Sequence, residues 1–332
     1  MDIENVKELK TRGAEQLERA EQQTRIVLIY AALVLGLSAA VTLVNYLLGL
    51  QISRLGGLGN MGIRTVLSTV QRILPVGQSV VALCMNLGLM AAMLRIARGQ
   101  YASPNTLRLG FDRFWPLLRL ALLKGLLFVG VGFVSIYLAT MIFLLTPLSG
   151  PAMEILMPLV SQSSVLNPEV ILDDGVYAQL TSAMLPVMLL FALIYCGTAA
   201  PMAYSYRMAE YVLIDRPAAG AMTAMRESKK MMRRRRLQLL RLDLGLWWYY
   251  AAALAAMAVC YGDVLLTGAG VTFPWSEDVS FFLFYGLYLV VQFAVCFFLR
   301  GRVEVTYALA YDALKPEEKQ NNGIVLGNIF QM

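Results

Sequence analysis

The sequence predicts an all-α integral membrane protein, a bundle of about six transmembrane helices with a basic amphipathic helix at its cytoplasmic face. Three observations predict this class. The 332 residues are 58% hydrophobic and only 15% charged, whereas soluble domains carry about 25% charged residues. Long charge-free runs alternate with short charged segments, as in chains that cross a bilayer repeatedly. Lys and Arg concentrate in some of these segments and are absent from others, which is the pattern of a protein with a fixed orientation in a membrane.

Residues 1–25 precede the first apolar run and mix six acidic with five basic residues. This composition predicts a solvated or surface-lying helix that continues into the first span and has no binding role of its own. A cleaved signal peptide would have a short basic start and a shorter apolar core. The first apolar run is therefore interpreted as a retained helix.

Six apolar runs are long enough to cross the hydrocarbon core of a bilayer, which takes about 20 residues. They are roughly 26–50, 73–94, 120–147, 183–206, 244–267 and 279–299. The second is the least apolar, because Pro75, Gln78 and Asn86 lie in or beside it. The sequence thus predicts three parts: an N-terminal helix at 1–25 on the cytoplasmic side, a transmembrane domain at 26–312 and a cytoplasmic tail at 313–332.

Polar side chains inside the spans are few. Asn45, Asn86 and Gln292 lie deep in their runs. Uncharged amides at such positions are typical of interhelical hydrogen bonds, so we expect helix contacts there rather than a transport path.

The distribution of charge places both termini in the cytoplasm. Segments 148–182 and 268–278 contain no Lys or Arg, whereas segment 207–243 contains ten, and short cytoplasmic loops retain basic residues. Segment 51–72 conflicts with this topology, because it should lie outside yet contains three arginines. Two interpretations stay open: an amphipathic helix on the outer surface, or a second run that re-enters the membrane instead of spanning it.

The basic segment 207–243 predicts contact with anionic lipid. Its ten basic and four acidic residues give a balance of +6, which equals the net charge of the whole chain. It directly precedes a span that begins with two Trp and two Tyr, an aromatic belt typical of the membrane interface. Basic clusters beside a membrane attract anionic lipid heads by about 1 kcal/mol per charge. The candidate contact residues, for lipid or for a membrane protein partner, are Lys229, Lys230, Arg233, Arg234, Arg235, Arg236 and Arg241.

Nucleic acid is not expected as a partner of the basic segment, because its Lys and Arg side chains would have to project well away from the membrane to reach it.

Met222, Met225 and Met232 can share one face of an amphipathic helix of about three turns. Four consecutive arginines, in contrast, surround most of a helix at about 100° per residue. The helix at 233–236 therefore either stands in water or breaks before the next span.

Catalytic and metal chemistry have little support in the composition. The chain has no histidine, the commonest general base and metal ligand. Its four cysteines all lie in apolar runs without a CxxC spacing, so we expect them to pack as small hydrophobic residues. The sequence predicts no catalytic residue, no cofactor and no metal site.

The stretch AYSYRMAEYVLIDRPAAGAMTAMRESKKMMRRRRLQLLRLDLGLWW resembles an uncharacterised bacterial multi-pass membrane family, the domain of unknown function nine-seven-five. The residues that carry the resemblance are Tyr204, Tyr206, Met208, Tyr211, Asp215, Pro217, Ser228, Lys229, Met232, Asp243 and Trp247. Arg95, Gly99, Phe111 and Phe114 fall on an earlier part of the family pattern, and Tyr307 and Tyr311 on its closing tyrosine motif.

The resemblance covers most of residues 80–312 and implies a multi-pass protein of the bacterial cytoplasmic membrane. It implies no reaction, ligand or catalytic residue. One departure is clear: the family usually has a glycine and then a lysine after the methionines, where this chain has Arg233 to Arg236.

Three functions are consistent with the sequence. The first is a non-enzymatic scaffold or regulator of other membrane proteins. The alternative is a transporter or lipid-handling permease, which prolines at 186 and 201 and the amides inside the spans would permit. The third is an interfacial enzyme built on Glu210, Tyr211 and Asp215, although no pair of these has a recognisable acid–base spacing.

Overall fold

A computed structural model describes residues 6–20, 23–55, 60–150, 153–154, 174–216, 218–268, 270–271 and 273–315. Within these ranges every regular element is a helix, as predicted. The first half of the chain forms α1 (Val6–Arg19), α2 (Gln23–Arg54), α3 (Met61–Ala97), η2 (Pro104–Arg108), α4 (Leu109–Asp112), α5 (Phe114–Leu145) and η3 (Pro147–Ser149). The second half forms α8 (Asp174–Tyr206), α9 (Ala209–Asp215), α10 (Ala221–Met231), α11 (Arg236–Gly245), α12 (Trp247–Cys260), α13 (Gly262–Gly268), α14 (Glu277–Val295), η4 (Cys296–Arg300) and α15 (Gly301–Leu314).

Five helical stretches in the described residues are long and apolar enough to cross a membrane, and a bent pair makes up to six. The five are Gln23–Arg54, Met61–Ala97, Phe114–Leu145, Ser182–Asp215 and Asp278–Leu314. The bent pair is α11 with α12, whose axes differ by 63°. The protein is therefore an all-α membrane protein with several spans, in agreement with the hydropathy pattern.

The chain divides into two compact units. Unit 1 comprises residues 1–119 and 208–332, and unit 2 comprises residues 120–207. In unit 2, the part of α5 after Arg119 packs against α8 through Ala139, Phe143 and Val187. Helix α8 continues through both of its prolines to Tyr206.

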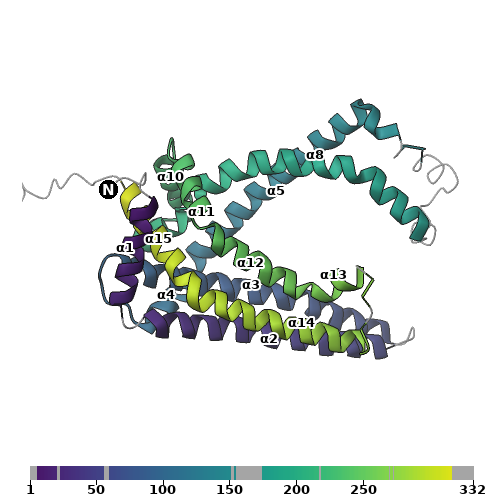
Figure 1. The fold of residues 1–332 in the computed structure, drawn as a ribbon, viewed down its shortest axis with the longest axis horizontal. Helices are drawn as coiled ribbons and strands as arrows, with labels where there is room; N and C mark the ends of the chain where they lie inside the picture. Colours follow the sequence, from purple (N-terminus) through teal and green to yellow (C-terminus); the bar gives the residue numbers. More distant parts are fainter. Residues whose placement is uncertain are drawn as a thin grey trace, which may run out of the picture. The chain divides into compact units, whose positions relative to one another are not determined.

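The long helices α2, α3, α12 and α14 of unit 1 run alongside one another (Figure 1); α2 packs against α3 and α14, and α14 packs against α12. Tyr285 of α14 lies within hydrogen-bond distance of two α2 hydroxyls, Ser38 at 3.1 Å and Thr42 at 2.9 Å. Gln71 of α3 donates to the backbone carbonyl of Asn45 on α2 at 3.2 Å. Polar side chains thus join neighbouring spans where both would otherwise face an apolar medium.

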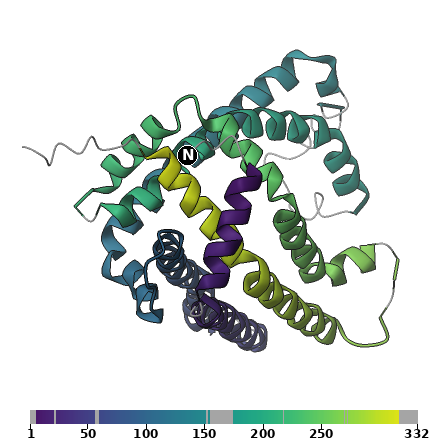
Figure 2. The same ribbon diagram turned by 60° about the vertical axis from the view of Figure 1, so that its left-hand side comes forward.

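Two sequence-based expectations about unit 1 are wrong. The N-terminal helix does not continue into the first span, because α1 ends at Arg19 and α2 begins at Gln23. It is also not a solvated leader: Leu9 and Leu17 are buried, and α1 crosses α15 (Figure 2). Residues 61–72 form neither a separate surface helix nor a re-entrant segment, since they are the first turns of one continuous helix that runs through Pro75.

Short helices gather at one end of unit 1 and form what we call the cap, residues 6–20, 98–113, 208–246 and 300–315. The cap packs around the last four turns of α3, from Cys84 onward, where the buried residues of this helix lie. Helices α1, η2, α4, α9 and α15 all pack against this part of the unit. Two glycines permit the closest approach: an added Cβ at Gly88 would overlap the backbone of Leu107, and one at Gly110 would overlap the backbone of Cys84.

Candidate functional site

The cap contains a cluster of four charged residues drawn from three distant parts of the chain. Arg98, at the end of α3, donates to Asp215 of α9 at 2.8 Å and to both oxygens of Asp312 on α15, at 3.0 Å from Nε and 2.6 Å from Nη2. Lys315 donates to the other oxygen of Asp215 at 2.7 Å. Two cations thus face two carboxylates, and we call this neutral group the clasp.

The clasp orients its central arginine and stabilises its charge. The carboxylate of Asp312, and then that of Asp215, accepts hydrogen bonds from Arg98, and these hydrogen bonds hold the pKa of the guanidinium above its ordinary value against the opposing effect of burial. A planar guanidinium can bind two carboxylates at once, because its N–H groups point outward along two different edges. Tyr311 adds a hydrogen bond from its hydroxyl to Asp215 at 3.3 Å.

A second polar group lies deeper, around Arg300. Its Nη2 donates to the Oδ1 of Asn86 on α3 at 2.8 Å, and its guanidinium lies over the ring of Tyr30 on α2, 4.9 Å from the centroid. Tyr30 donates to the same Asn86 oxygen. Glu304, one turn further along, lies 4.0 Å from Arg300 and accepts from the hydroxyl of Tyr211 at 3.3 Å. An arginine inside a helix bundle is stabilised in this way by an amide, an aromatic face and a carboxylate.

A third contact joins α11 and α12 to α15. The hydroxyl of Tyr307 donates to Asp243, and the hydroxyls of Tyr307 and Tyr250 lie 2.7 Å apart. Lys10 of α1 donates to the carbonyl of Gly245, the last residue of α11. Helix α15 is thus the element on which α3, α9 and α11 converge.

Removing one hydroxyl tests the third contact. Tyr307→Phe is expected to lower the free energy of unfolding by about 1–2 kcal/mol, because Asp243 loses a hydrogen bond that its charge strengthens. The midpoint of thermal unfolding of the detergent-purified chain measures this. Tyr101→Phe is the matched control, since Tyr101 is 71% exposed; equal shifts for the two variants would contradict the assignment.

The structure brings together some of the family-motif residues and separates others. Tyr211, Asp215 and Asp243 all contact α15, where they meet the two tyrosines of the closing motif; the rings of Tyr211 and Tyr311 stack at 5.4 Å. The remaining positions lie elsewhere: Ser228 is fully buried in α10, Trp247 is 67% exposed, and Tyr204 and Tyr206 belong to unit 2. Pro217 lies outside the described residues.

The predicted lipid-contact residues form a separate surface, which we call the basic face. Of Lys229, Lys230, Arg233, Arg234, Arg235, Arg236 and Arg241, six are exposed and Arg236 is half-buried. The ion pairs between described residues of the cap use other cations, among them Arg98, Arg216, Arg300 and Lys315. The basic face therefore keeps an uncompensated positive charge.

The amphipathic helix expected before the arginines is α10, which buries Ala221, Ala224, Met225 and Ser228 and exposes its lysines. The expectation that three methionines share its apolar face is wrong for Met222, which is 57% exposed. The helix then breaks, as one of the two alternatives predicted. Arg234 has φ +75°, in the left-handed region that glycine enters without a steric penalty. This is the stretch in which the resembled family usually has glycine.

Helix α11 presents apolar side chains on two faces. Leu239, Leu242 and Leu246 are buried within the cap, while Leu237 and Leu244 are 70% and 64% exposed. Exposed leucines two turns apart, next to exposed arginines, are typical of a helix that lies in a membrane interface. The 63° bend into α12 gives α11 a direction different from that of the following span.

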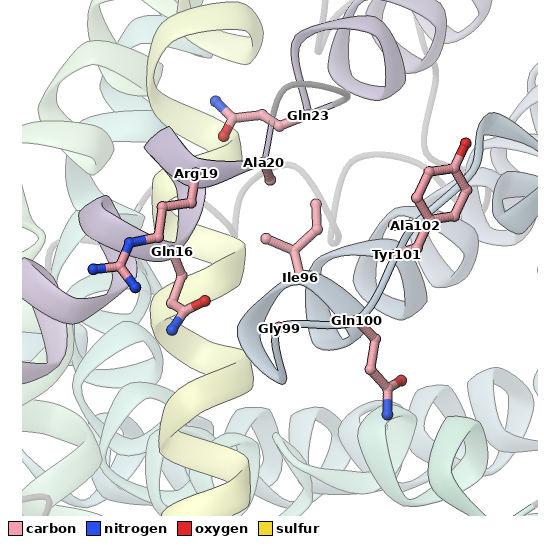
Figure 3. A pocket seen from close by; sticks show the side chains of 9 residues that line it. All are labelled: Gln16, Arg19, Ala20, Gln23, Ile96, Gly99, Gln100, Tyr101 and Ala102. Carbon is pink, nitrogen blue, oxygen red and sulfur yellow. The ribbon is translucent and has the colours of Figure 1, made fainter.

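A groove of about 740 Å³ lies between the end of α1 and the end of α3. Its lining residues are Gln16, Arg19, Ala20, Gln23, Ile96, Gly99, Gln100, Tyr101 and Ala102 (Figure 3). Ile96 points into the space between the helices, but the guanidinium of Arg19 and the amide of Gln100 point away from it (Figure 3). The polar groups do not converge on one point, so the groove has no arrangement for a reaction or a specific ligand.

The expectations for amides inside the spans have mixed outcomes. Asn86 does form the interhelical hydrogen bonds predicted for it. The prediction is wrong for Gln292, whose amide donates to the sulfur of Cys296 one turn along the same helix, and for Asn45, whose Oδ1 has no partner among the described residues. The sequence gives no signal that singles out Arg98, Arg300 or Asp312.

Comparison with known proteins identifies a family and nothing more specific. The profile of the family described as Protein of unknown function (DUF975) matches residues 1–317, which confirms the resemblance seen in the motif residues. No curated protein and no solved structure matches the chain.

Proposed function

The chain belongs to the family described as Protein of unknown function (DUF975), and we propose that it is a non-enzymatic scaffold or regulator in a bacterial cytoplasmic membrane. In this role the cap lies on the cytoplasmic side, and its basic face docks on anionic lipid heads. The observation that carries the proposal is the contrast within the cap: the charges of the clasp are paired with one another, whereas the six exposed residues of the basic face make no ion pair with any described residue.

The orientation is supported by where charge accumulates. Segments 6–20, 98–113, 208–246 and 300–315 all belong to the cap, and the segment richest in Lys and Arg, 207–243, lies almost entirely within it. Basic residues are retained on the cytoplasmic side of a membrane. Segment 268–278, which contains no basic residue, connects the other ends of α13 and α14.

A scaffold role is supported by the state of the carboxylates in the cap. Asp215 and Asp312 accept hydrogen bonds from cations, Asp243 from a phenol, and Glu304 from a phenol beside an arginine. A general base needs a carboxylate that is within reach of a substrate proton and not held by a permanent cation. These contacts instead hold α15 against three other helices, which suits a rigid platform.

Neutralising the four consecutive arginines tests the role of the basic face. We expect the quadruple variant R233Q/R234Q/R235Q/R236Q to retain at least fivefold less anionic lipid than the original chain, because each basic residue near a charged membrane surface contributes about 1 kcal/mol. The measurement is mass spectrometry of lipids and proteins that copurify with the tagged full chain from native membranes in mild detergent.

The matched control replaces the same four residues by lysine, which keeps the charge. The lysine variant should retain the lipid, and raising the salt concentration should release it, since salt screens exposed charges. Equal lipid retention by the glutamine and lysine variants would overturn the proposed role of the basic face. A protein partner that copurifies in stoichiometric amount with the original chain would support the scaffold role, and its absence would argue against that role.

A further inference from the structure

A continuous apolar groove runs between α2 and α3 on the surface of unit 1, and one of its ends reaches the η2–α4 segment of the cap. One part, of about 380 Å³, lies between the first turns of α2, the α3 turn around Val81 and Met85, and the η2–α4 segment. A second part, of about 350 Å³, continues between the same two helices toward Val70. Leu37 and Val81 line both parts, so the two form one groove.

A single cation stands at one end of this groove. Apart from Arg108, the cap-side part is lined by aliphatic, aromatic and proline side chains. Arg108 is exposed and makes no ion pair with any residue that the structure describes; Asp112, four residues further on, does not pair with it either. An unpaired guanidinium at the mouth of an apolar channel fits an amphipathic ligand with an anionic head.

The length of the groove suits one lipid chain. From Val70 to Met85 the axis of α3 rises by about 22 Å, which exceeds the roughly 15 Å of hydrocarbon in one bilayer leaflet, so the groove is long enough for one acyl chain. We propose that this groove binds the acyl chain of an anionic phospholipid, with its phosphate on Arg108 and its chain between α2 and α3. The site does not depend on the basic face, which is built from other residues on α10 and α11.

The groove contains a position at which a blocking side chain can be added without strain. Gly77 lines the groove, and no heavy atom of the protein lies within 4 Å of a Cβ added to it. A phenylalanine there would occupy the groove and leave the packing of α2 on α3 intact. Gly130, on α5, is equally open and is exposed, so Gly130→Phe is the matched control.

The experiment uses the full chain in nanodiscs that contain phosphatidylglycerol with a photoreactive diazirine at the end of one acyl chain. Parallel discs contain phosphatidylcholine with the same chain. After illumination, peptide mass spectrometry locates the labelled residues. We expect phosphatidylglycerol to label residues 70–85 at least fivefold more than phosphatidylcholine does. Gly77→Phe should abolish this labelling, Gly130→Phe should leave it unchanged, and Arg108→Gln should lower the phosphatidylglycerol signal to the phosphatidylcholine level.

Two results would overturn the proposal. Equal labelling of residues 70–85 by the two lipids would indicate ordinary contact with the surrounding bilayer. An absence of labelling by either lipid would indicate that another occupant, such as a second copy of the chain, covers the groove. Because all variants keep Arg233 to Arg236, neither result bears on the role of the basic face.

Discussion

Gly88→Ala is expected to destabilise the protein more than any other single methyl addition in α3. A Cβ at this position would lie 2.6 Å from the Cα and 2.7 Å from the carbonyl carbon of Leu107, whereas carbon atoms in contact are separated by about 3.5–4.0 Å. The obstacle is backbone, which cannot rotate away, so η2 and α4 must move off α3. We expect a loss of about 3 kcal/mol, although alanine favours a helix by about 1 kcal/mol over glycine.

The measurement is the midpoint of thermal unfolding of the detergent-purified full chain, followed by tryptophan fluorescence. Gly110→Ala should behave similarly, because its Cβ would lie 2.6 Å from the carbonyl carbon of Cys84. Gly77→Ala, in the same helix but with nothing within 4 Å of the added Cβ, should leave the midpoint unchanged or raise it slightly. An unchanged midpoint in Gly88→Ala would show that α3 and η2 are further apart than described.

Arg300→Leu is expected to produce the second large effect. The substitution removes the hydrogen bond to Asn86 and the cation that faces both Tyr30 and Glu304. Hydrogen bonds that involve a charged group contribute about 1.5–3 kcal/mol, and the Arg300 side chain is only 21% exposed. A loss of about 2–3 kcal/mol and a clearly lower unfolding midpoint should follow.

Arg302→Leu is the control for this prediction, because Arg302 lies on the same helix but is exposed. Its unfolding midpoint should change little. Arg300→Lys should restore part of the stability, since an ammonium group keeps the charge but not the planar fork of donors. If Arg300→Leu and Arg302→Leu shift the midpoint equally, the buried polar group has no stabilising role.

Much of the fold could be predicted from the sequence because it depends on local pattern. A bilayer requires each span to be apolar and to satisfy its own backbone hydrogen bonds, so a charge-free run such as 26–50 identifies a helix wherever its neighbours lie. The same holds for α10, whose amphipathic pattern is complete within eleven residues. The break at the arginines also has a local cause, because four consecutive charges cannot share one face.

The polar groups of the cap could be predicted only in part. Asn86 was expected to contact another helix because an amide inside a span has few alternatives. Its partners, Tyr30 and Arg300, were not foreseen, and Gln292 satisfied its amide within its own helix instead. Hydropathy identifies the polar side chains that lie in a span and need a hydrogen-bond partner. Several side chains elsewhere in the sequence could serve equally well as that partner, and only the packing of the helices decides which one is near.

The sequence by itself determined the class of protein, the approximate positions of its long helices and the location of its uncompensated positive charge, since each of these follows from the composition of a short window. Only the tertiary structure decided that Arg98 meets Asp312, 214 residues away, that α1 crosses α15, and that α2 and α3 enclose a groove ending at Arg108. These features require particular side chains on separate helices to come together, and no local preference specifies which helices become neighbours.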